Sequence, residues 1–158
     1  MKPDLLIIDG YNLLHQDPKL AALLRSDLMA ARQRLVRKVE NTAHRMAPKT
    51  IIVFDGQEAG IDDSLTVRHI EVCFSPSNCS ADTIIERLVC RYAALEKILV
   101  ITSDHAEHET VSSAGAQVMS VQEFLAQCER DSRRSIPSAM RPGERPTLGD
   151  LFPKDFCG

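Results

Sequence analysis

The sequence LLIIDGYN occupies residues 5–12, where a short apolar run leads into an acid, a glycine and two polar side chains. Four apolar residues bounded by Pro3 and Gly10 predict a strand that is buried on both faces. Asp9 ends that strand, and Gly10 allows the chain to turn sharply after it. In parallel α/β sheets, ligands bind beyond the carboxyl ends of the strands. We therefore expect Asp9 to lie at a metal or phosphate site.

Similar apolar runs recur along the chain and alternate with helical patterns. They predict further strands at residues 50–54, 68–74, 97–101 and 116–121. Helices are predicted at residues 18–24, from Ser26 or Asp27 to about Arg45, and at residues 81–95, 106–114 and 122–130. Residues 10–17 and 57–67 are predicted to be loops. This alternation predicts an α/β fold with a mostly parallel five-stranded sheet and helices on both faces.

The composition fits one domain and excludes several classes of protein. The chain has 158 residues, 44% of them hydrophobic, and a net charge of -3, so it is not a basic protein that binds polyanions over its whole surface. Five cysteines without a CxxC pair indicate free thiols in a reducing compartment. We find no signal sequence and no apolar run of about 18 residues, and we expect a cytoplasmic protein. The predicted domain covers residues 1–130, and the proline-containing residues 131–158 are predicted to be a tail, packed on the domain or flexible.

Several carboxylates are expected at one edge of the sheet. Asp9, Asp55 and Asp104 follow strand ends, Asp82 begins the helix after the third strand, and Glu86 lies one helical turn later. If the strand order reverses between the first and fourth strands, Asp9 and Asp104 become neighbours. Grouped carboxylates repel one another unless a cation joins them, and hard oxygen ligands suit Mg²⁺ or Mn²⁺. All five acids are therefore candidate metal ligands, in a site suited to hydrolysis of a phosphodiester.

Each candidate also has a structural interpretation. Asp82 can interact with the helix dipole, Asp104 can be an N-cap, Asp55 can belong to a turn, and Glu86 can be a solvated helix residue. The metal hypothesis therefore depends on the five acids taken together and not on any one of them. Asn12 follows closely after Asp9 and can orient a water or a phosphate. The sequence HAEHE at residues 105–109 lacks the HExxH spacing of a zinc site and is interpreted as a surface helix.

Four segments together resemble the NYN domain family, in its bacterial YacP-like branch of the PIN-like nuclease superfamily. They are DGYNLL at residues 9–14, VFDG at 53–56, SADTIIE at 80–86 and VITSD at 100–104, and the similarity covers residues 4 to 129. The resemblance implies a Rossmann-like, PIN-like three-layer fold and an endoribonuclease site that depends on Mg²⁺ or Mn²⁺. It implies Asp9, Asp82 and Asp104 as the acids that hold the metal, and Asn12 as their polar partner among the catalytic residues. Glu86 and Asp55 match nearby family positions.

The same resemblance implies RNA, in particular mRNA on the ribosome, as the partner, because one member of the branch resembles a ribosome-associated nuclease that cuts mRNA in the decoding site. The connector at residues 75–79 departs from the more basic or Thr/Gly-rich connector expected of the family.

The predicted second helix carries four basic residues that can neutralise RNA phosphates. They are Arg34, Arg37, Lys38 and Arg45. The alternative is a solvated helix face whose charges form ion pairs. Tyr11 is the aromatic residue placed to stack on a base near Asp9, or it is a partly buried loop residue.

Three other functions compete with the endoribonuclease. A HAD-like phosphatase is disfavoured, because Tyr11 occupies the position where that chemistry needs a second acid. A nucleotide-binding Rossmann domain is disfavoured, because no glycine-rich phosphate motif occurs. An RNA- or ribosome-binding module with a weak or silent site remains the alternative.

Overall fold

The strands of this protein form one central sheet. The computed structural model describes residues 2–55, 60–61, 67, 69–76, 78–94 and 96–135. Within them the strands are β1 (Leu5–Asp9), β2 (Lys49–Asp55), β3 (Gly60–Ile61), β4 (Ile70–Ser75), β5 (Ile98–Ile101) and β6 (Gln117–Met119). Five of them lie within two residues of the predicted strands. The sixth, β3, lies in the stretch 57–67 that was predicted to be a loop.

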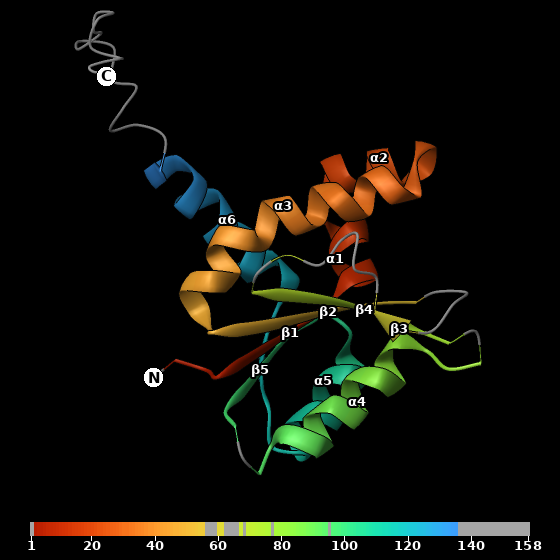
Figure 1. Cartoon of the computed structure of the whole chain (residues 1–158), viewed down its shortest axis with the longest axis vertical. Helices are drawn as coiled ribbons and strands as arrows, with labels where there is room; N and C mark the ends of the chain where they lie inside the picture. The colour runs from red at the N-terminus through yellow and green to blue at the C-terminus, as the bar shows by residue number, and fades with distance from the viewer. Residues whose placement is uncertain are drawn as a thin grey trace, which may run out of the picture.

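The strand order is β3-β4-β2-β1-β5-β6 (Figure 1). The five longer strands pair in parallel, as predicted, whereas β3 pairs antiparallel with the end of β4. β1 lies between β2 and β5, with Asp9 beside Val53 and Ile8 beside Ile101. The chain therefore winds outward from β1 in both directions, and its strand order reverses between β1 and β5. In such sheets the ligand site lies at the carboxyl ends of the two strands that flank the reversal.

Helices cover both faces of the sheet, which confirms the three-layer α/β class (Figure 1). They are α1 (Gly10–Gln16), α2 (Pro18–Ser26), α3 (Leu28–Met46), α4 (Ala81–Tyr92), α5 (His105–Ser113) and α6 (Val121–Ser135). α1, α3 and α6 pack on one face, and α4 and α5 pack on the other.

The prediction of a loop at residues 10–17 was wrong, because α1 begins directly after β1. Asp9 accepts a hydrogen bond from the backbone N–H of Asn12 and so caps the helix. Leu13 and Leu14 of α1 are fully buried, and this burial outweighs the turn propensity of the Asp-Gly pair. α2 follows with almost no gap, capped by Asp17.

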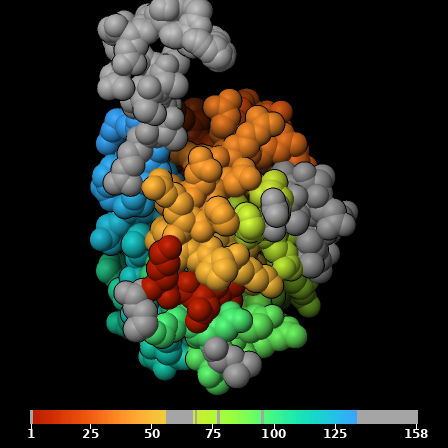
Figure 2. All heavy atoms as spheres, turned by 60° about the vertical axis from the view of Figure 1, so that its left-hand side comes forward, coloured from red at the N-terminus to blue at the C-terminus, as the bar shows by residue number. Residues whose placement is uncertain are grey.

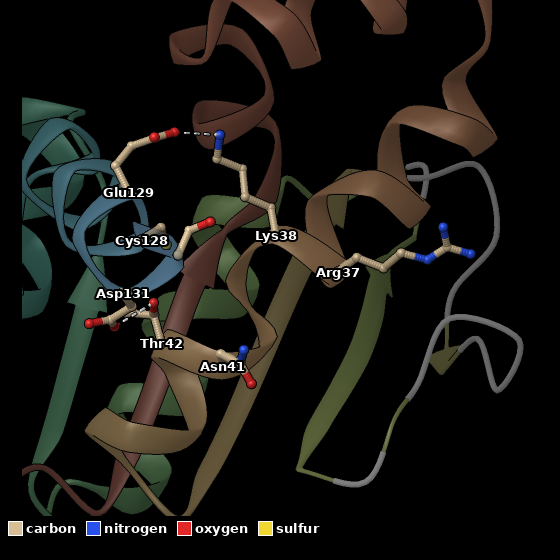
Figure 3. Close-up of a pocket in the computed structure, with 8 residues that line it drawn as sticks. Arg37, Lys38, Asn41, Thr42, Cys128, Glu129 and Asp131 are labelled. Atoms are coloured by element: carbon tan, nitrogen blue, oxygen red, sulfur yellow. Dashed lines mark hydrogen bonds and ion pairs between the residues drawn. The ribbon is translucent and has the colours of Figure 1, made fainter. Parts of the chain in front are cut away.

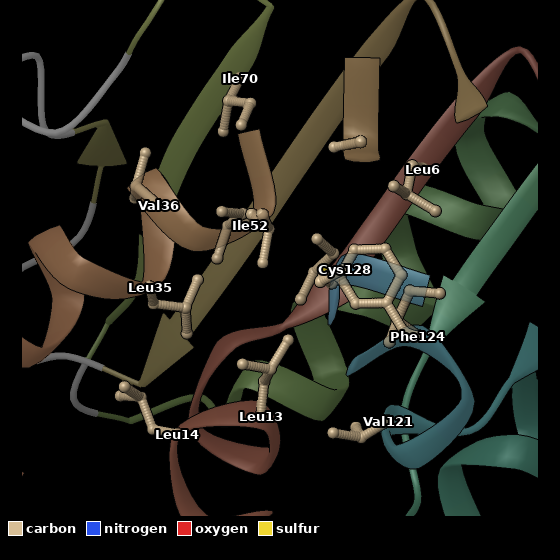
Figure 4. Close-up of a cluster of buried hydrophobic side chains, with 14 of the residues drawn as sticks. Leu6, Leu13, Leu14, Leu35, Val36, Ile52, Ile70, Val121, Phe124 and Cys128 are labelled. Atoms are coloured by element: carbon tan, nitrogen blue, oxygen red, sulfur yellow. The ribbon is translucent and has the colours of Figure 1, made fainter. Parts of the chain in front are cut away.

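Two apolar clusters hold the layers together. Figure 4 shows the first, in which side chains of α1, α3 and α6, among them Leu13, Leu35 and Phe124, meet Leu6 and Ile52 of the sheet. The second cluster lies between the sheet and α4 and α5. Successive side chains of a strand point to opposite faces. Ile8 therefore faces α3, and the next residue, Asp9, faces α4 and α5.

The last helix is longer than predicted. α6 continues to Ser135, past the expected end at residue 130, because buried Asp131 accepts a hydrogen bond from Thr42 of α3 at 2.8 Å. Residues 136–158, which carry most of the predicted tail and Cys157, lie outside the described residues. The division into residues 1–130 and 131–158 stays a prediction. Cys73, Cys79, Cys90 and Cys128 are free thiols, as expected.

Figure 2 views the side of the molecule on which the chain begins. The first residues, in red, lie there between orange residues of α3 and β2 and green residues that follow in the sequence. The strands begin near this side, so their carboxyl ends lie on the opposite side. Among the helices that the structure describes, none has the length and apolarity needed to cross a lipid bilayer.

Candidate metal centre

Asp9 is held rigidly at the carboxyl edge of the sheet. Its side chain is 6% exposed, and its Oδ1 accepts from the Asn12 backbone N–H at 3.3 Å. Gly10 is required beside it, because a Cβ at this position would lie 2.4 Å from the ring of Phe54. The residue that ends β1 is thus also the N-cap of α1, with no loop between the two elements.

Three acids from separate segments meet at this edge. One carboxylate oxygen each from Asp9, Asp82 and Glu107 lies within 4.8 Å of the other two. Asp82 is in the first turn of α4, which Ser80 caps, and Glu107 is in the first turn of α5. The acids of β1 and α4 were predicted to meet, whereas Glu107 was not among the candidates.

Glu107 was assigned to a surface helix, and that assignment was wrong. The residue is 3% exposed, and its Oε1 accepts a hydrogen bond from the Thr102 hydroxyl at 2.8 Å. Among the described residues, its buried Oε2 accepts no hydrogen bond. The pattern Asp104-x-x-Glu107, which begins just after a strand, resembles a capping box and was the available signal for a glutamate that turns back toward the strand end.

Asp104 is the N-cap of α5. Its Oδ1 accepts from the backbone N–H groups of Ala106 at 2.9 Å and of Glu107 at 3.2 Å, which orients the first turn. β1 and β5 are neighbours, as the predicted reversal requires, so Asp104 lies near Asp9 and its charge raises the pKa of Asp9. Among the described residues Asp104 is outside the group of three acids whose oxygens lie within 4.8 Å.

The remaining predicted acids lie around this group. Asp55, at the end of β2, is exposed and accepts from the Ala81 backbone N–H at 2.6 Å and from the Ser75 hydroxyl at 3.2 Å. It therefore joins the end of the sheet to the start of α4 and places Asp82. Glu86 is half-buried, one turn beyond Asp82, and is not part of the group of three.

The electrostatics of the acid group favour a bound cation. Burial raises the pKa of Asp9 above its ordinary value, although hydrogen bonds from Glu107 and Asn12 oppose the rise. Burial and the charge of Asp9 also raise the pKa of Asp82. For Glu107, burial together with its hydrogen bond to Asp9 raises the pKa to about 9. Without a cation, the group therefore keeps a proton at neutral pH.

The donor set fits a hard divalent cation. Asp9, Asp82 and Glu107 offer only carboxylate oxygens, which suit Mg²⁺ or Mn²⁺. The buried Oε2 of Glu107 accepts no hydrogen bond from the described residues, so it is free to bind a metal ion once Glu107 has lost its proton. A cation would also offset the burial and the repulsion that raise the three pKa values.

Asn12 is oriented by its neighbours. Its side-chain Oδ1 accepts from the Ser103 backbone N–H at 3.1 Å, which identifies the oxygen and leaves the Nδ2 group to donate. The Ser103 hydroxyl in turn accepts from the Val121 backbone N–H at 3.0 Å and donates to Gln122 at 2.9 Å. The amide of Asn12 is thus fixed beside Asp9 as a hydrogen-bond donor.

The four basic residues predicted to bind RNA differ in their surroundings. Lys38 forms ion pairs with Asp17 at 2.9 Å and with Glu129 at 3.4 Å. Arg45 forms an ion pair with Asp131 at 3.4 Å. Arg34 and Arg37 are exposed. Lys38 and Arg45 therefore form the ion pairs expected if this helix face is a solvated surface and not an RNA-binding one.

A cavity of about 200 Å³ lies between α3 and α6 (Figure 3). It is lined by Arg37, Lys38, Asn41, Thr42, Cys128, Glu129, Asp131 and Ser132. Because both signs of charge line it, it does not form a basic groove for a phosphate backbone.

Tyr11 is half-buried at the start of α1. Its ring meets the ring of Phe54 edge-on, with 5.5 Å between centroids and 64° between planes. Its hydroxyl accepts a hydrogen bond from Arg32, a residue that was not among the predicted candidates. Stacking of Tyr11 on a base stays a prediction.

Comparison with known proteins identifies relatives of this chain. The model of the YacP-like NYN domain matches residues 6–147. The Bacillus subtilis (strain 168) protein YacP, described as uncharacterized, is 32% identical over 133 residues, which cover 83% of this chain and 78% of that protein. The crystal structure of Rae1 (YacP) from Bacillus subtilis matches with a TM-score of 0.72 at 31% identity, over 84% of this chain and 77% of that one. The structure of a point mutant of Rae1 matches with a TM-score of 0.68 at 32% identity, over 83% and 78% of the two chains. The chain therefore belongs to the YacP-like NYN domain family, whose members share a PIN-like, nuclease-like fold.

Proposed function

We propose that this protein is an endoribonuclease that depends on Mg²⁺ or Mn²⁺ and hydrolyses RNA phosphodiester bonds. The observation that carries the proposal is the meeting of Asp9, Asp82 and Glu107 at the reversal of strand order, where one buried carboxylate oxygen accepts no hydrogen bond from the described residues. Membership in a nuclease-like family supports the same reaction.

The side chains of the site have separate roles in this proposal. Asp9, Asp82 and Glu107 would hold the cation, which supplies Lewis-acid activation of water and neutralises charge on the phosphate. Glu107 would hold the cation as a carboxylate and release its proton to solvent, because the cation's charge would offset the burial and the negative charge that raise its pKa. Asn12, whose Nδ2 faces no acceptor among the described residues, donates to a phosphate oxygen. Asp104 fixes the turn that carries Glu107, and its negative charge adds to that of the acid group that would hold the cation.

We further infer that mRNA in association with the ribosome is the substrate and that the protein acts in the cytoplasm. The support is the sequence resemblance of residues 4 to 129 to the YacP-like branch. Exposed Arg34 and Arg37 on α3 are available for contacts with a polyanion.

An RNA cleavage assay tests the reaction. Wild-type protein and the variants Asp9→Asn and Glu107→Gln are incubated with single-stranded and structured RNA in Mg²⁺, Mn²⁺ or chelator. Glu109→Gln is the matched control, because Glu109 is exposed on the same helix two residues from Glu107. We expect cleavage by the wild type and the control with metal only, and a loss of about 100-fold or more in both site variants.

Two results would contradict this proposal. Cleavage that persists in chelator or in Asp9→Asn would place the chemistry elsewhere. RNA binding without cleavage in any metal would favour the alternative, a binding module with a silent site.

A further inference from the structure

Arg32, in the first half of α3, is surrounded by aromatic rings. Its Cζ lies 4.7 Å from the ring centroid of Phe74, 5.4 Å from that of Phe54 and 5.8 Å from that of Tyr11. Its Nη2 donates to the Tyr11 hydroxyl at 2.5 Å. Cation–π contacts of this kind attract the guanidinium and fix its orientation.

Most of the hydrogen-bond donors of Arg32 have no acceptor in the part of the chain that the structure describes. A guanidinium has five N–H donors, and the Tyr11 hydroxyl accepts from one of them. The Nε atom is buried without a partner, and within the described ranges no carboxylate forms an ion pair with Arg32. Lys38 and Arg45 of the same helix are both paired with acids. Arg32 is thus a half-buried cation without a counter-ion among the described residues, a state that favours binding of an anion.

The fold places Arg32 at the same edge of the sheet as the acids. α3 ends at Met46, just before β2 begins at Lys49, so its first turns lie over the carboxyl ends of the strands. Phe54 and Phe74 are the penultimate residues of β2 and β4. Arg32 and the acid group therefore share one edge.

The two groups lie on opposite faces at that edge. Phe54 and Phe74 pack with the cluster under α3, whereas Asp9 faces α4 and α5. A strand of RNA that crosses the edge would meet the acids from one face and Arg32 from the other.

We propose that Arg32 binds a phosphate of the RNA strand, next to the phosphodiester that lies at the acid group. This inference rests on the proposed function. Tyr11, Phe54 and Phe74 act as positioning residues that keep the guanidinium in place. A planar guanidinium that is already oriented forms bidentate hydrogen bonds to phosphate oxygens with little further loss of side-chain entropy.

A binding experiment tests the contact apart from the cleavage. All variants carry Asp9→Asn, so that the RNA stays intact in Mg²⁺, and Asp9→Asn alone is the parent. The ligand is a short fluorescent single-stranded RNA. Arg32→Gln removes the cation, Arg32→Lys keeps the charge without the planar fork, and Lys97→Gln is the control. Lys97 is exposed just before β5, at the opposite edge of the sheet, and its substitution removes the same charge.

We expect Arg32→Gln to weaken RNA binding by about 5- to 30-fold and to reduce the slope of log K against log salt by about 1. Arg32→Lys should bind with intermediate affinity. Lys97→Gln should match its parent in affinity and slope. Equal affinity and equal slope in Arg32→Gln and its parent would overturn the inference.

A second measurement separates a direct contact from a structural role. The same RNA is prepared with one uncharged methylphosphonate linkage, moved stepwise along the strand. With Arg32 present, one linkage should cost more affinity than its neighbours, and this extra loss should vanish in Arg32→Gln. If Arg32 only stabilises the fold, all RNAs weaken in parallel and the melting temperature falls, which would refute the contact.

The outcomes distinguish the two proposals. If no linkage position shows a loss of affinity that depends on Arg32, and the wild type still cleaves RNA, the Arg32 contact alone is refuted. If one linkage position shows a loss of affinity that depends on Arg32, but the wild type cleaves no RNA in any metal, the endoribonuclease is refuted and the phosphate contact is supported. A wild type that binds no RNA would refute both.

Discussion

Substitution of Glu107 by Gln should stabilise the metal-free protein at alkaline pH. The folded state raises the pKa of Glu107 from its ordinary value of 4.5 to about 9, because the side chain is buried beside Asp9. Between these values the folded protein binds a proton that the unfolded chain has released. The free energy of unfolding of the wild type therefore falls as the pH rises through this window. Gln does not titrate, so the variant loses this dependence.

The size of the effect follows from the pKa difference. Each unit corresponds to about 1.4 kcal/mol, so the 3.5 units between 4.5 and pH 8 set an upper limit of about 5 kcal/mol. Relaxation and water entry around the ionised carboxylate reduce this, and we expect the variant to be more stable by about 1–3 kcal/mol at pH 8. At pH 5 the two proteins should differ little, because Gln resembles the protonated acid in shape.

Urea denaturation in chelator at pH 5, 6.5 and 8 measures this difference, with Glu109→Gln as the exposed control. Addition of Mg²⁺ at pH 8 should stabilise the wild type more than the variant, since only the ionised carboxylate is a good ligand. A stability difference that stays the same from pH 5 to pH 8 would show that Glu107 is not a buried, protonated acid.

Substitutions at three further positions probe the surroundings of the site by urea denaturation. Asp104→Ala should cost about 1 kcal/mol and Asp104→Asn much less, because Asn retains the cap of α5; equal losses would contradict the capping role. Gly10→Ala should cost about 1–3 kcal/mol, since its Cβ meets the Phe54 ring, and an unchanged midpoint would disprove this close approach. Lys38→Met should cost about 1–2 kcal/mol near pH 7, because it removes the ion pair of Asp17, which is 4% exposed. Hydrogen bonds from Lys38 and the backbone hold the pKa of Asp17 below its ordinary value despite its burial. The loss of stability in Lys38→Met should therefore shrink as the pH falls below about 4 and Asp17 becomes protonated. A loss of stability that grows in acid would refute the pairing.

The parts of the fold that could be predicted are those with a local sequence signal. Buried strands such as residues 5–9 are short apolar runs, and Asp9 and Asp82 stand out because acids there follow a strand end or a helix cap. One predicted arrangement was a sheet in which the strand order reverses between the first and fourth predicted strands. The observed order, with β2 on one side of β1 and β5 on the other, confirms that reversal.

The remainder depends on tertiary packing. Glu107 lies in a polar segment without an apolar stripe; the Asp104-x-x-Glu107 pattern indicates where its side chain turns, and the docking of α5 on the sheet determines its burial. The ion pairs of Lys38 join residues at positions 17, 38 and 129, which no local pattern relates. Arg32 was not recognised for the same reason, because its three aromatic neighbours come from separate elements.

The direct junction of β1 and α1 also has a mechanical consequence. Because Asp9 ends the strand and caps the helix, it cannot move unless one of those elements moves with it. A core change beneath α1, such as Leu13→Ala, would be transmitted to the carboxylate without any contact with substrate. Loss of activity in such a variant would report a displaced ligand, so packing defects and chemical defects at this edge need to be separated by direct measurement of metal binding.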